Sequence, residues 1–395
     1  LYFLSILLYL LPSFNLFIIY SHGLAKLLSI FLLFLNLLNL KKKLKKLTPF
    51  FTLFALFSLT QSVSIINVID IESFLNRYKD FLFIIIFFIN SYFYFLDGRL
   101  GEKSKIRYFL SPLFFSAVFT IFCQILIFFF PDLFLMASSP FLYSGYLKLI
   151  KMNIERGRIF FDSYEQVFIP LIFYFLFFLK RGQKKHTKHY FSFFLALLLI
   201  TISLISVLAN FRTKFLMFLF STLSSLVMFK KLIKRKVFIY FFLLLSFVFF
   251  TLEIIKLGLT INIFDRFYLI NEVQERSSIN FRLIQINDAW DIFIKKPFFG
   301  VGLGNYWYYS SQKVKSFDLF YYYYKKILED TKANVHNIFF NILTETGVFG
   351  FTSFLAILIY FIYLDLSLIK KGKDLFKEST IIAFWSLFIY SLFNP

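Results

Sequence analysis

Long apolar runs separated by short polar segments extend along the whole chain. Each run is close to the roughly 20 residues that a helix needs to cross a hydrocarbon core of about 30 Å. Only helices satisfy their own backbone hydrogen bonds in lipid, and the runs lack the polar–apolar alternation of barrel strands. The pattern therefore predicts an all-α, polytopic bundle of about eleven spanning helices. The predicted helices cover residues 1–20, 24–40, 48–67, 81–96, 108–130, 164–179, 190–209, 215–229, 237–257, 348–369 and 377–393.

Lysine and arginine gather where these runs stop. The clusters lie at residues 41–46, 99–107, 180–188, 230–236 and 370–377. Basic residues at helix ends mark the cytoplasmic side of a membrane protein. This rule sends the segments 68–80, 131–163, 210–214 and 258–347 to the opposite side.

The composition agrees with a membrane protein. Hydrophobic residues make up 59% of the 395 residues and charged residues only 16%, against about 25% charged in a soluble domain. The net charge of +21 resides largely in the helix-end clusters, where it sets orientation and attracts anionic lipid head groups. We therefore expect membrane lipids as partners and no nucleic acid.

The spacing of the runs divides the chain into three parts. Residues 1–257 would hold nine spanning helices, 258–347 a large outer loop, and 348–395 the C-terminal spanning helices. A loop of about 90 residues is far longer than an ordinary connection, and loops of that length are usually functional. The catalytic residues are therefore expected in the loop.

The first part of the loop predicts a capped amphipathic helix over Ser277–Phe293, with Arg282 in its first turns. Lys295-Lys296-Pro297 would end that helix. The glycine-alternate stretch Gly300–Gly304 permits unusual backbone angles and close approach of a ligand or helix. It lacks the preceding strand and the spacing of a dinucleotide site. The tyrosines that follow, at 306–309 and 321–324, suit either sugar stacking or the membrane interface.

The end of the loop carries a His-Asn pair, His336-Asn337, which is expected to open a short outer helix. Nine residues separate Asn337 from Gly347. Gly347 and Gly350 precede the next spanning helix. This arrangement resembles the O-antigen ligase and polysaccharide polymerase superfamily. Its members are multi-spanning enzymes that act on lipid-linked glycans.

The resemblance covers roughly residues 150–370. Arg282 followed by Pro297 and the glycine stretch looks like the family's run ahead of its histidine. Arg212 lies in a short outer turn similar to one in the family, although Phe211 stands where the family usually has serine. The stretch from Arg156-Gly157-Arg158 to Asp162-Ser163 is loosely like another family turn. The resemblance implies catalytic roles for His336, Arg282 and Arg212 and substrate-binding roles for Arg156, Arg158 and Asn337.

These residue types suit the implied reaction. Arginine binds phosphate oxygens bidentately and can stabilise a diphosphate as it leaves. Histidine supplies a base near neutral pH, and a helix start would keep His336 in its neutral form. No zinc-protease motif, Cys–His ligand spacing or Asp-x-Asp pair occurs in the outer segments. We therefore expect no cofactor and no metal; the resemblance implies direct displacement with inversion.

The expected function is transfer of a glycan from polyprenyl diphosphate to lipid A core, on the periplasmic face of a bacterial inner membrane. The histidine spacing favours such a ligase. A repeat-unit polymerase, a protein O-oligosaccharyltransferase and a transporter of lipid-linked glycan remain as alternatives. A transporter should carry ionisable residues in mid-helix, where this chain has almost none.

Overall fold

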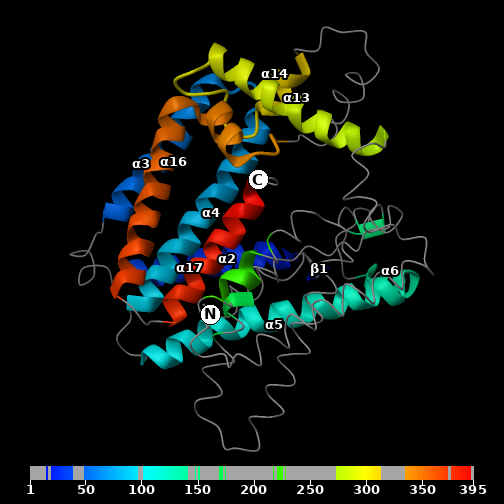
Figure 1. Cartoon of the computed structure of the whole chain (residues 1–395), viewed down its shortest axis with the longest axis vertical. Coiled ribbons are helices and arrows are strands. Elements are labelled where there is room, and N and C mark those ends of the chain that lie inside the picture. Colours follow the sequence, from blue (N-terminus) through cyan, green and yellow to red (C-terminus); the bar gives the residue numbers. More distant parts are fainter. Residues whose placement is uncertain are drawn as a thin grey trace, which may run out of the picture. The chain divides into compact units, whose positions relative to one another are not determined.

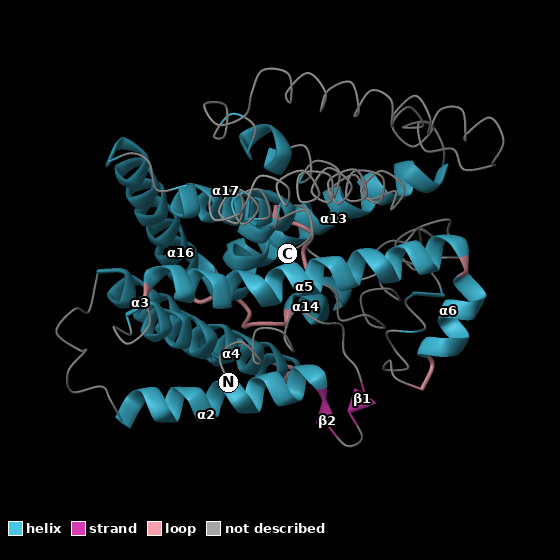
Figure 2. Ribbon diagram, turned by 90° about the horizontal axis from the view of Figure 1, so that it is seen from below, coloured by secondary structure: helices cyan, strands magenta, loops and turns pink. Residues whose placement is uncertain are grey.

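The computed structural model describes residues 15–16, 19–38, 49–96, 101–140, 273–312, 334–371 and 375–392, with short helical stretches between 147 and 227. Within these ranges the regular elements are helices, apart from one small hairpin, and loops connect them (Figure 2). The hairpin pairs β1 (Asn15–Leu16) with β2 (Ile19–Tyr20). The spanning helix predicted over residues 1–20 is therefore wrong for residues 15–16 and 19–20. Pro12 and Asn15 are poor helix formers, which is consistent with an interruption there.

The chain divides into two compact units, of which the first comprises residues 1–36, 89–267 and 373–389. Its described helices are α2 (Ser21–Leu38), α5 (Glu102–Phe129), α6 (Pro131–Ser138) and α17 (Leu375–Ser391). Asn90 donates a hydrogen bond of 2.7 Å to the Ser29 carbonyl on α2. The rings of Phe109 and Phe376 meet edge to face at 6.5 Å, which joins α5 to α17.

The second unit comprises residues 37–88, 268–372 and 390–395. Its elements are α3 (Pro49–Val63), the 3-10 helix η3 (Ser64–Asn67), the first part of α4 (Ile71–Leu96), α13 (Val273–Lys295), α14 (Tyr306–Gln312) and α16 (Ile338–Lys371). In Figure 1, α16 runs beside α3, and α13 and α14 lie across one end of this pair. The Thr60 and Ser353 hydroxyls, 3.4 Å apart, lie between α3 and α16. Small polar residues of this kind let helices approach closely in a membrane.

Two described helical segments are long and apolar enough to cross a membrane, Ser104–Ile127 and Ile338–Ile369. Two shorter apolar helices lie at Ala25–Phe34 and Thr52–Asn67. The helices predicted over 190–209 and 237–257 fall outside the described residues, and those predicted over 164–179 and 215–229 are described only in part. The count of about eleven spanning helices therefore remains a prediction.

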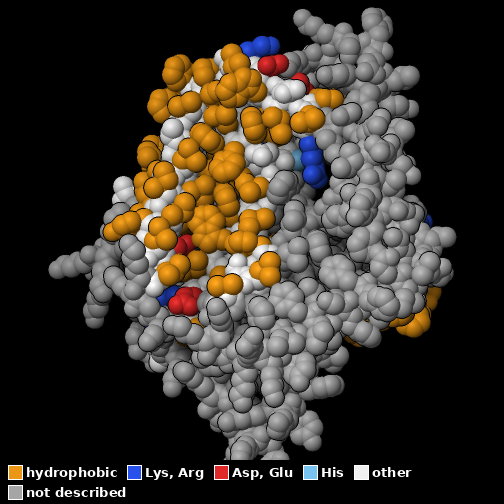
Figure 3. Space-filling model, viewed as in Figure 1, with side chains coloured by type: hydrophobic (Ala, Val, Ile, Leu, Met, Phe, Trp, Pro, Cys, Tyr) orange, Lys and Arg blue, Asp and Glu red, His pale blue; other side chains and the backbone are white. Residues whose placement is uncertain are grey.

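The side of the second unit formed by α3 and α16 is covered with hydrophobic side chains (Figure 3). Leu59 is 60% exposed, Ile359 65% and Tyr363 66%. In water, a contiguous apolar surface of this extent is unusual. In lipid it is the expected exterior of a helix, because the surrounding tails are equally apolar.

The predicted outer loop over residues 68–80 is shorter than expected. α4 begins at Ile71, which leaves only Val68–Asp70 as the connection. Asp70 explains the early start, since its carboxylate accepts hydrogen bonds from the Ser73 backbone N–H (3.1 Å) and hydroxyl (2.6 Å). An aspartate in this position satisfies donors that a helix start leaves free.

The amphipathic helix of the large loop is confirmed, but its beginning is not where the serines predicted it. α13 starts at Val273, so Ser277 and Ser278 lie inside the helix. The residues ahead of them, Gln274-Glu275-Arg276, are good helix formers and extend the helix backwards. As a consequence, Arg282 lies near the middle of α13.

Candidate functional site

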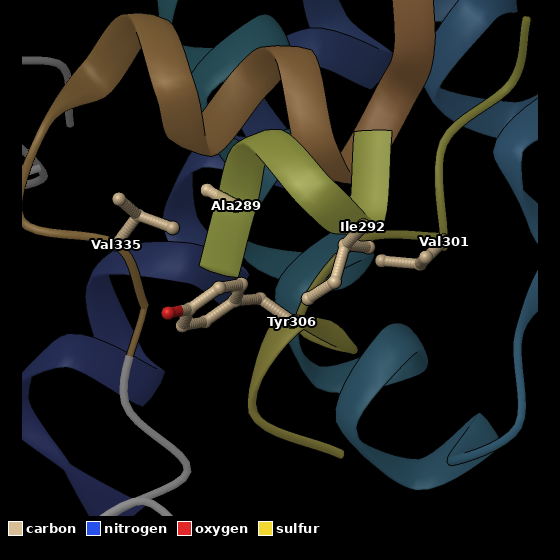
Figure 4. Close-up of a cluster of buried hydrophobic side chains, with 5 residues drawn as sticks. All are labelled: Ala289, Ile292, Val301, Tyr306 and Val335. Carbon is tan, nitrogen blue, oxygen red and sulfur yellow. The ribbon is translucent and has the colours of Figure 1, made fainter. Parts of the chain in front are cut away.

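The site is assembled in the second unit from α13, the glycine segment (residues 300–304), α14, the loop that carries His336, and the start of α16. A small apolar core holds these elements together (Figure 4). It consists of Ala289, Ile292, Val301, Tyr306 and Val335, none more than 4% exposed. Burying one such large side chain contributes roughly 1.5–3 kcal/mol. The core therefore fixes the loop carrying His336 against α13 and α14.

His336 lies immediately before a capped helix start. The side-chain oxygen of Asn337 accepts hydrogen bonds from the backbone N–H groups of Phe339 (3.0 Å) and Phe340 (3.2 Å). Asn337 is thus the N-cap of α16, because it satisfies donors that the first turn leaves free. The prediction that the His-Asn pair opens a helix is confirmed. Its predicted role in binding substrate stays a prediction.

The surroundings of His336 favour the neutral imidazole. Burial lowers the pKa of His336 below its usual value of 6.5, and the positive charge of Arg282 lowers it further. Both effects act in the expected direction, because burial disfavours any charged form of the imidazole and Arg282 repels its positive charge. The direction agrees with the sequence-based expectation, although burial rather than the helix start is the main cause. The ring of Phe281 lies 6.4 Å from the imidazole and contributes to that burial.

The glycine segment lies directly against the first part of α16. The N–H of Val301 donates to the Thr344 carbonyl (3.0 Å) and that of Gly302 to the Glu345 carbonyl (2.9 Å). At Gly300 (φ +66°), a side chain would collide with the backbone of Glu345. At Gly347 (φ +66°), one would collide with the backbone of Phe298. The glycines therefore allow two backbones to approach where a side chain has no room.

Gly347 also redirects α16. Its φ of 66° and ψ of −167° are not helical, so a short segment over Ile338–Thr346 is separated from the long apolar part that follows. The N–H of Val348 donates to the Pro297 carbonyl at 2.7 Å, which secures the bend. The glycine pair that the sequence places between a short outer helix and a spanning helix occupies this junction.

A buried carboxylate lies behind the glycine segment. Glu345 is only 4% exposed and accepts a hydrogen bond of 2.9 Å from the Gly304 N–H. The Asn341 amide lies 3.5 Å from its other oxygen. Arg77, on α4, interacts electrostatically with Glu345, and a side chain at Gly304 would meet the aliphatic stem of Arg77 at 2.9 Å. A nearby cation of this kind offsets part of the cost of burying a charge.

The end of η3 and its connection to α4 are part of the same scaffold. The Asn67 side chain donates to the Gly300 carbonyl at 2.7 Å. The Asn305 side-chain oxygen accepts a hydrogen bond from the Asp70 N–H at 2.8 Å, and its amide donates to the Asp70 carbonyl at 3.1 Å. Segments more than 200 residues apart in the sequence are thus joined through paired polar groups.

The structure brings Arg282, His336 and Asn337 together. Arg212, Arg156 and Arg158 lie outside the described residues. Sequence reasoning did not single out Gln285, Glu345 or Arg77. The helical spacing of Gln285 from Arg282 could have indicated the first, but Glu345 and Arg77 become related only through the tertiary fold. Within the described ranges, no three His, Cys, Asp or Glu side chains gather as a metal site would require.

A family model described as O-antigen ligase matches residues 195–355 of the chain. The matched segment contains Arg282, His336, Asn337 and Glu345, whereas Arg77 lies outside it. A search of curated proteins found no match.

Proposed function

We propose, from the membership of residues 195–355 in the O-antigen ligase superfamily, that the chain is a membrane glycosyltransferase using a polyprenyl-diphosphate-linked glycan. Members of this family are embedded in membranes. The observation that carries the proposal is the pairing of a permanently charged Arg282 with a half-buried His336 whose pKa is lowered. A base that stays neutral beside a fixed cation suits transfer from an anionic leaving group.

In the proposed reaction, the acceptor hydroxyl attacks the anomeric carbon of the donor sugar. His336 takes the hydroxyl proton, a new carbon–oxygen bond forms, and the bond from the anomeric carbon to the diphosphate oxygen breaks. The electron pair leaves with the diphosphate, whose developing charge Arg282 stabilises. A single displacement of this kind inverts the anomeric centre and needs no metal.

Arg212 is proposed as a second cation for the diphosphate, on the family resemblance of its turn. Arg156, Arg158 and Asn337 are proposed to bind the saccharide or phosphate. For Asn337, this role would use the amide nitrogen, because its side-chain oxygen already caps α16.

The proposed location is a bacterial inner membrane, with the site on the periplasmic side. About eleven spanning helices would anchor the chain in the membrane, with the division at residues 257 and 347 as predicted. The apolar face of α3 and α16 supports embedding in lipid. The basic clusters support the orientation.

Lipid A core is the proposed acceptor, since the matching family is described as O-antigen ligase. A repeat-unit polymerase would use the same chemistry with a growing glycan as acceptor, and a protein O-oligosaccharyltransferase would use a protein hydroxyl. In the remaining alternative, the chain would transport lipid-linked glycan and catalyse no reaction.

Deletion of the gene, followed by gel analysis of surface glycan, separates these functions. A ligase predicts loss of long chains from lipid A core while a lipid-linked polymer accumulates. A polymerase predicts a single repeat unit on the core, and a transporter predicts glycan retained in the cytoplasm. Complementation with His336→Ala should fail at wild-type membrane abundance, and restored glycan would refute the enzymatic proposal.

A further inference from the structure

The side chain of Gln285 connects α13 to the backbone that carries His336. Gln285 is completely buried. Its oxygen accepts a hydrogen bond from the His336 backbone N–H at 3.2 Å, and its nitrogen donates to the Asn334 carbonyl at 3.1 Å. Because one partner is a donor and the other an acceptor, both ends of the amide are satisfied and its orientation is determined.

Two further contacts hold the same position. The Tyr306 hydroxyl donates to the Gln285 backbone carbonyl at 3.2 Å. Val335, between the two residues that the amide binds, is 0% exposed and belongs to the apolar core. Sliding the loop along α13 would leave buried polar groups unpaired, at a cost of about 1–3 kcal/mol each.

Gln285 follows Arg282 by three residues on α13. Side chains with this spacing are neighbours on one side of a helix. The amide therefore binds the loop on the side of α13 that also presents Arg282. The two proposed catalytic groups share one support, although they are separated by more than 50 residues in the sequence.

We propose that Gln285 is a positioning residue for glycan transfer, whose amide fixes the His336 backbone relative to Arg282. This inference rests on the proposed function. The imidazole must reach the acceptor hydroxyl while the guanidinium reaches the diphosphate, so the distance between the His336 backbone and α13 matters. A displacement of about 1 Å can reduce a reaction rate by about 100-fold.

The test compares Gln285→Met with Asn287→Ala in membranes containing the full chain. Methionine has a similar length and tolerates apolar burial, but cannot form either hydrogen bond. Asn287 is exposed on the same helix and serves as the matched control. The donor is a lipid extract of host membranes containing polyprenyl-diphosphate-linked glycan. At equal abundance, Gln285→Met should lower kcat by about tenfold or more with a smaller change in KM.

The pH profile distinguishes positioning from a general loss of folded protein. Activity requires neutral His336 and is lost as the pH falls through its pKa. Release of the loop should expose the imidazole and return its pKa toward 6.5. The acid limb of the profile, where activity falls with decreasing pH, should therefore move to higher pH. If Gln285 had a purely structural role, the variant would lower the activity by the same factor at every pH. The pH at which activity falls on the acid side would then stay unchanged.

A second measurement does not depend on activity. Acylation of His336 by diethyl pyrocarbonate, followed by mass spectrometry across pH, reports the neutral imidazole directly. Its midpoint should rise in Gln285→Met and stay unchanged in Asn287→Ala. Should methionine reduce abundance, Gln285→Leu provides the same readout without adding a charge, because leucine can form neither hydrogen bond.

The two proposals fail in different ways. An inactive wild-type protein with a raised acylation midpoint in the variant would remove the enzymatic function and leave the structural clamp. An active wild-type protein whose kcat, acid limb and acylation midpoint are all unchanged by the Gln285 variants would overturn the positioning role.

Discussion

At the residue scale, the relation between Arg282 and His336 is more informative than either residue alone. An arginine near a membrane surface is commonly an anchor, and a histidine near a helix start is commonly a packing residue. Here the arginine is close enough to lower the pKa of the histidine, which is also partly buried. The same charge that would stabilise a departing diphosphate thus keeps the base ready to accept a proton.

The first prediction concerns the pH dependence of transfer. Since the pKa of His336 lies below 6.5, activity should persist below pH 6.5 and fall as the imidazole becomes protonated. Arg282→Gln removes the positive charge, so the pKa should rise and the acid limb should move to higher pH. Residual transfer measured at matched abundance across pH 5–8 tests this. An acid limb that moves to lower pH would contradict the assigned electrostatics.

The second prediction separates the two roles of Asn337. Asn337→Asp keeps an oxygen for the N-cap, whereas Asn337→Ala removes it and should destabilise α16 by about 1 kcal/mol. Thermal unfolding in detergent measures this difference, with the exposed Asn287→Ala as control. If the amide nitrogen binds substrate, the aspartate variant should be as stable as wild type but raise KM about tenfold. An unchanged KM would leave Asn337 with the capping role alone.

At the element scale, the site depends on a backbone contact between the glycine segment and the start of α16. Two carbonyls of that helix accept hydrogen bonds from Val301 and Gly302. The kink at Gly347 then separates the short segment near His336 from the long apolar part of α16. The short segment can therefore hold polar groups while the remainder satisfies the requirements of lipid.

The third prediction tests this contact. Gly300→Ala and Gly347→Ala combine a positive φ with a collision against backbone, so each should cost about 2 kcal/mol or more and lower membrane abundance. Gly101→Ala is the control, because a side chain there meets nothing within 4 Å. Abundance by immunoblot and melting in detergent measure the effect. A Gly300→Ala protein as stable as Gly101→Ala would show that the close approach is dispensable.

At the scale of the whole molecule, the N-terminal half contributes directly to the scaffold of the site. Asn67 and Asp70 bond to the glycine segment and Asn305, and Arg77 supplies charge near Glu345. These three residues lie outside the matched segment 195–355. A fragment limited to that segment would lack three of the site's supports, so the family segment should not function when expressed alone.

The fourth prediction concerns the side of the membrane on which α13 lies. In a Cys123→Ser background, the chain has no other cysteine. Asn287→Cys should then react with an impermeant maleimide added from the periplasmic side, and Lys43→Cys should react only after the membrane is opened. The reverse pattern would place the site in the cytoplasm and exclude a periplasmic donor.

The sequence by itself determined the helical class and the apolar runs. It also singled out Arg282, His336 and the glycines as candidate site residues. Helical periodicity, side-chain chemistry and the exclusion of side chains from tight turns act locally, so they are visible in a linear pattern. Local patterns also predicted the wrong start for α13 and too long a loop over 68–80. At α4, the Asp70 cap moved the start of the helix toward the N-terminus. At α13, the helix formers ahead of Ser277 moved the start to Val273.

Only the tertiary structure decided how the distant segments are supported. The amide of Gln285 binds a loop about 50 residues away, and Arg77 acts on a carboxylate more than 260 residues away. Such pairs leave no periodic trace, because their energies come from burial and geometry created when the chain folds. The sequence determines which chemical groups are present, and their low-dielectric, hydrogen-bonded surroundings in the fold determine what they can do.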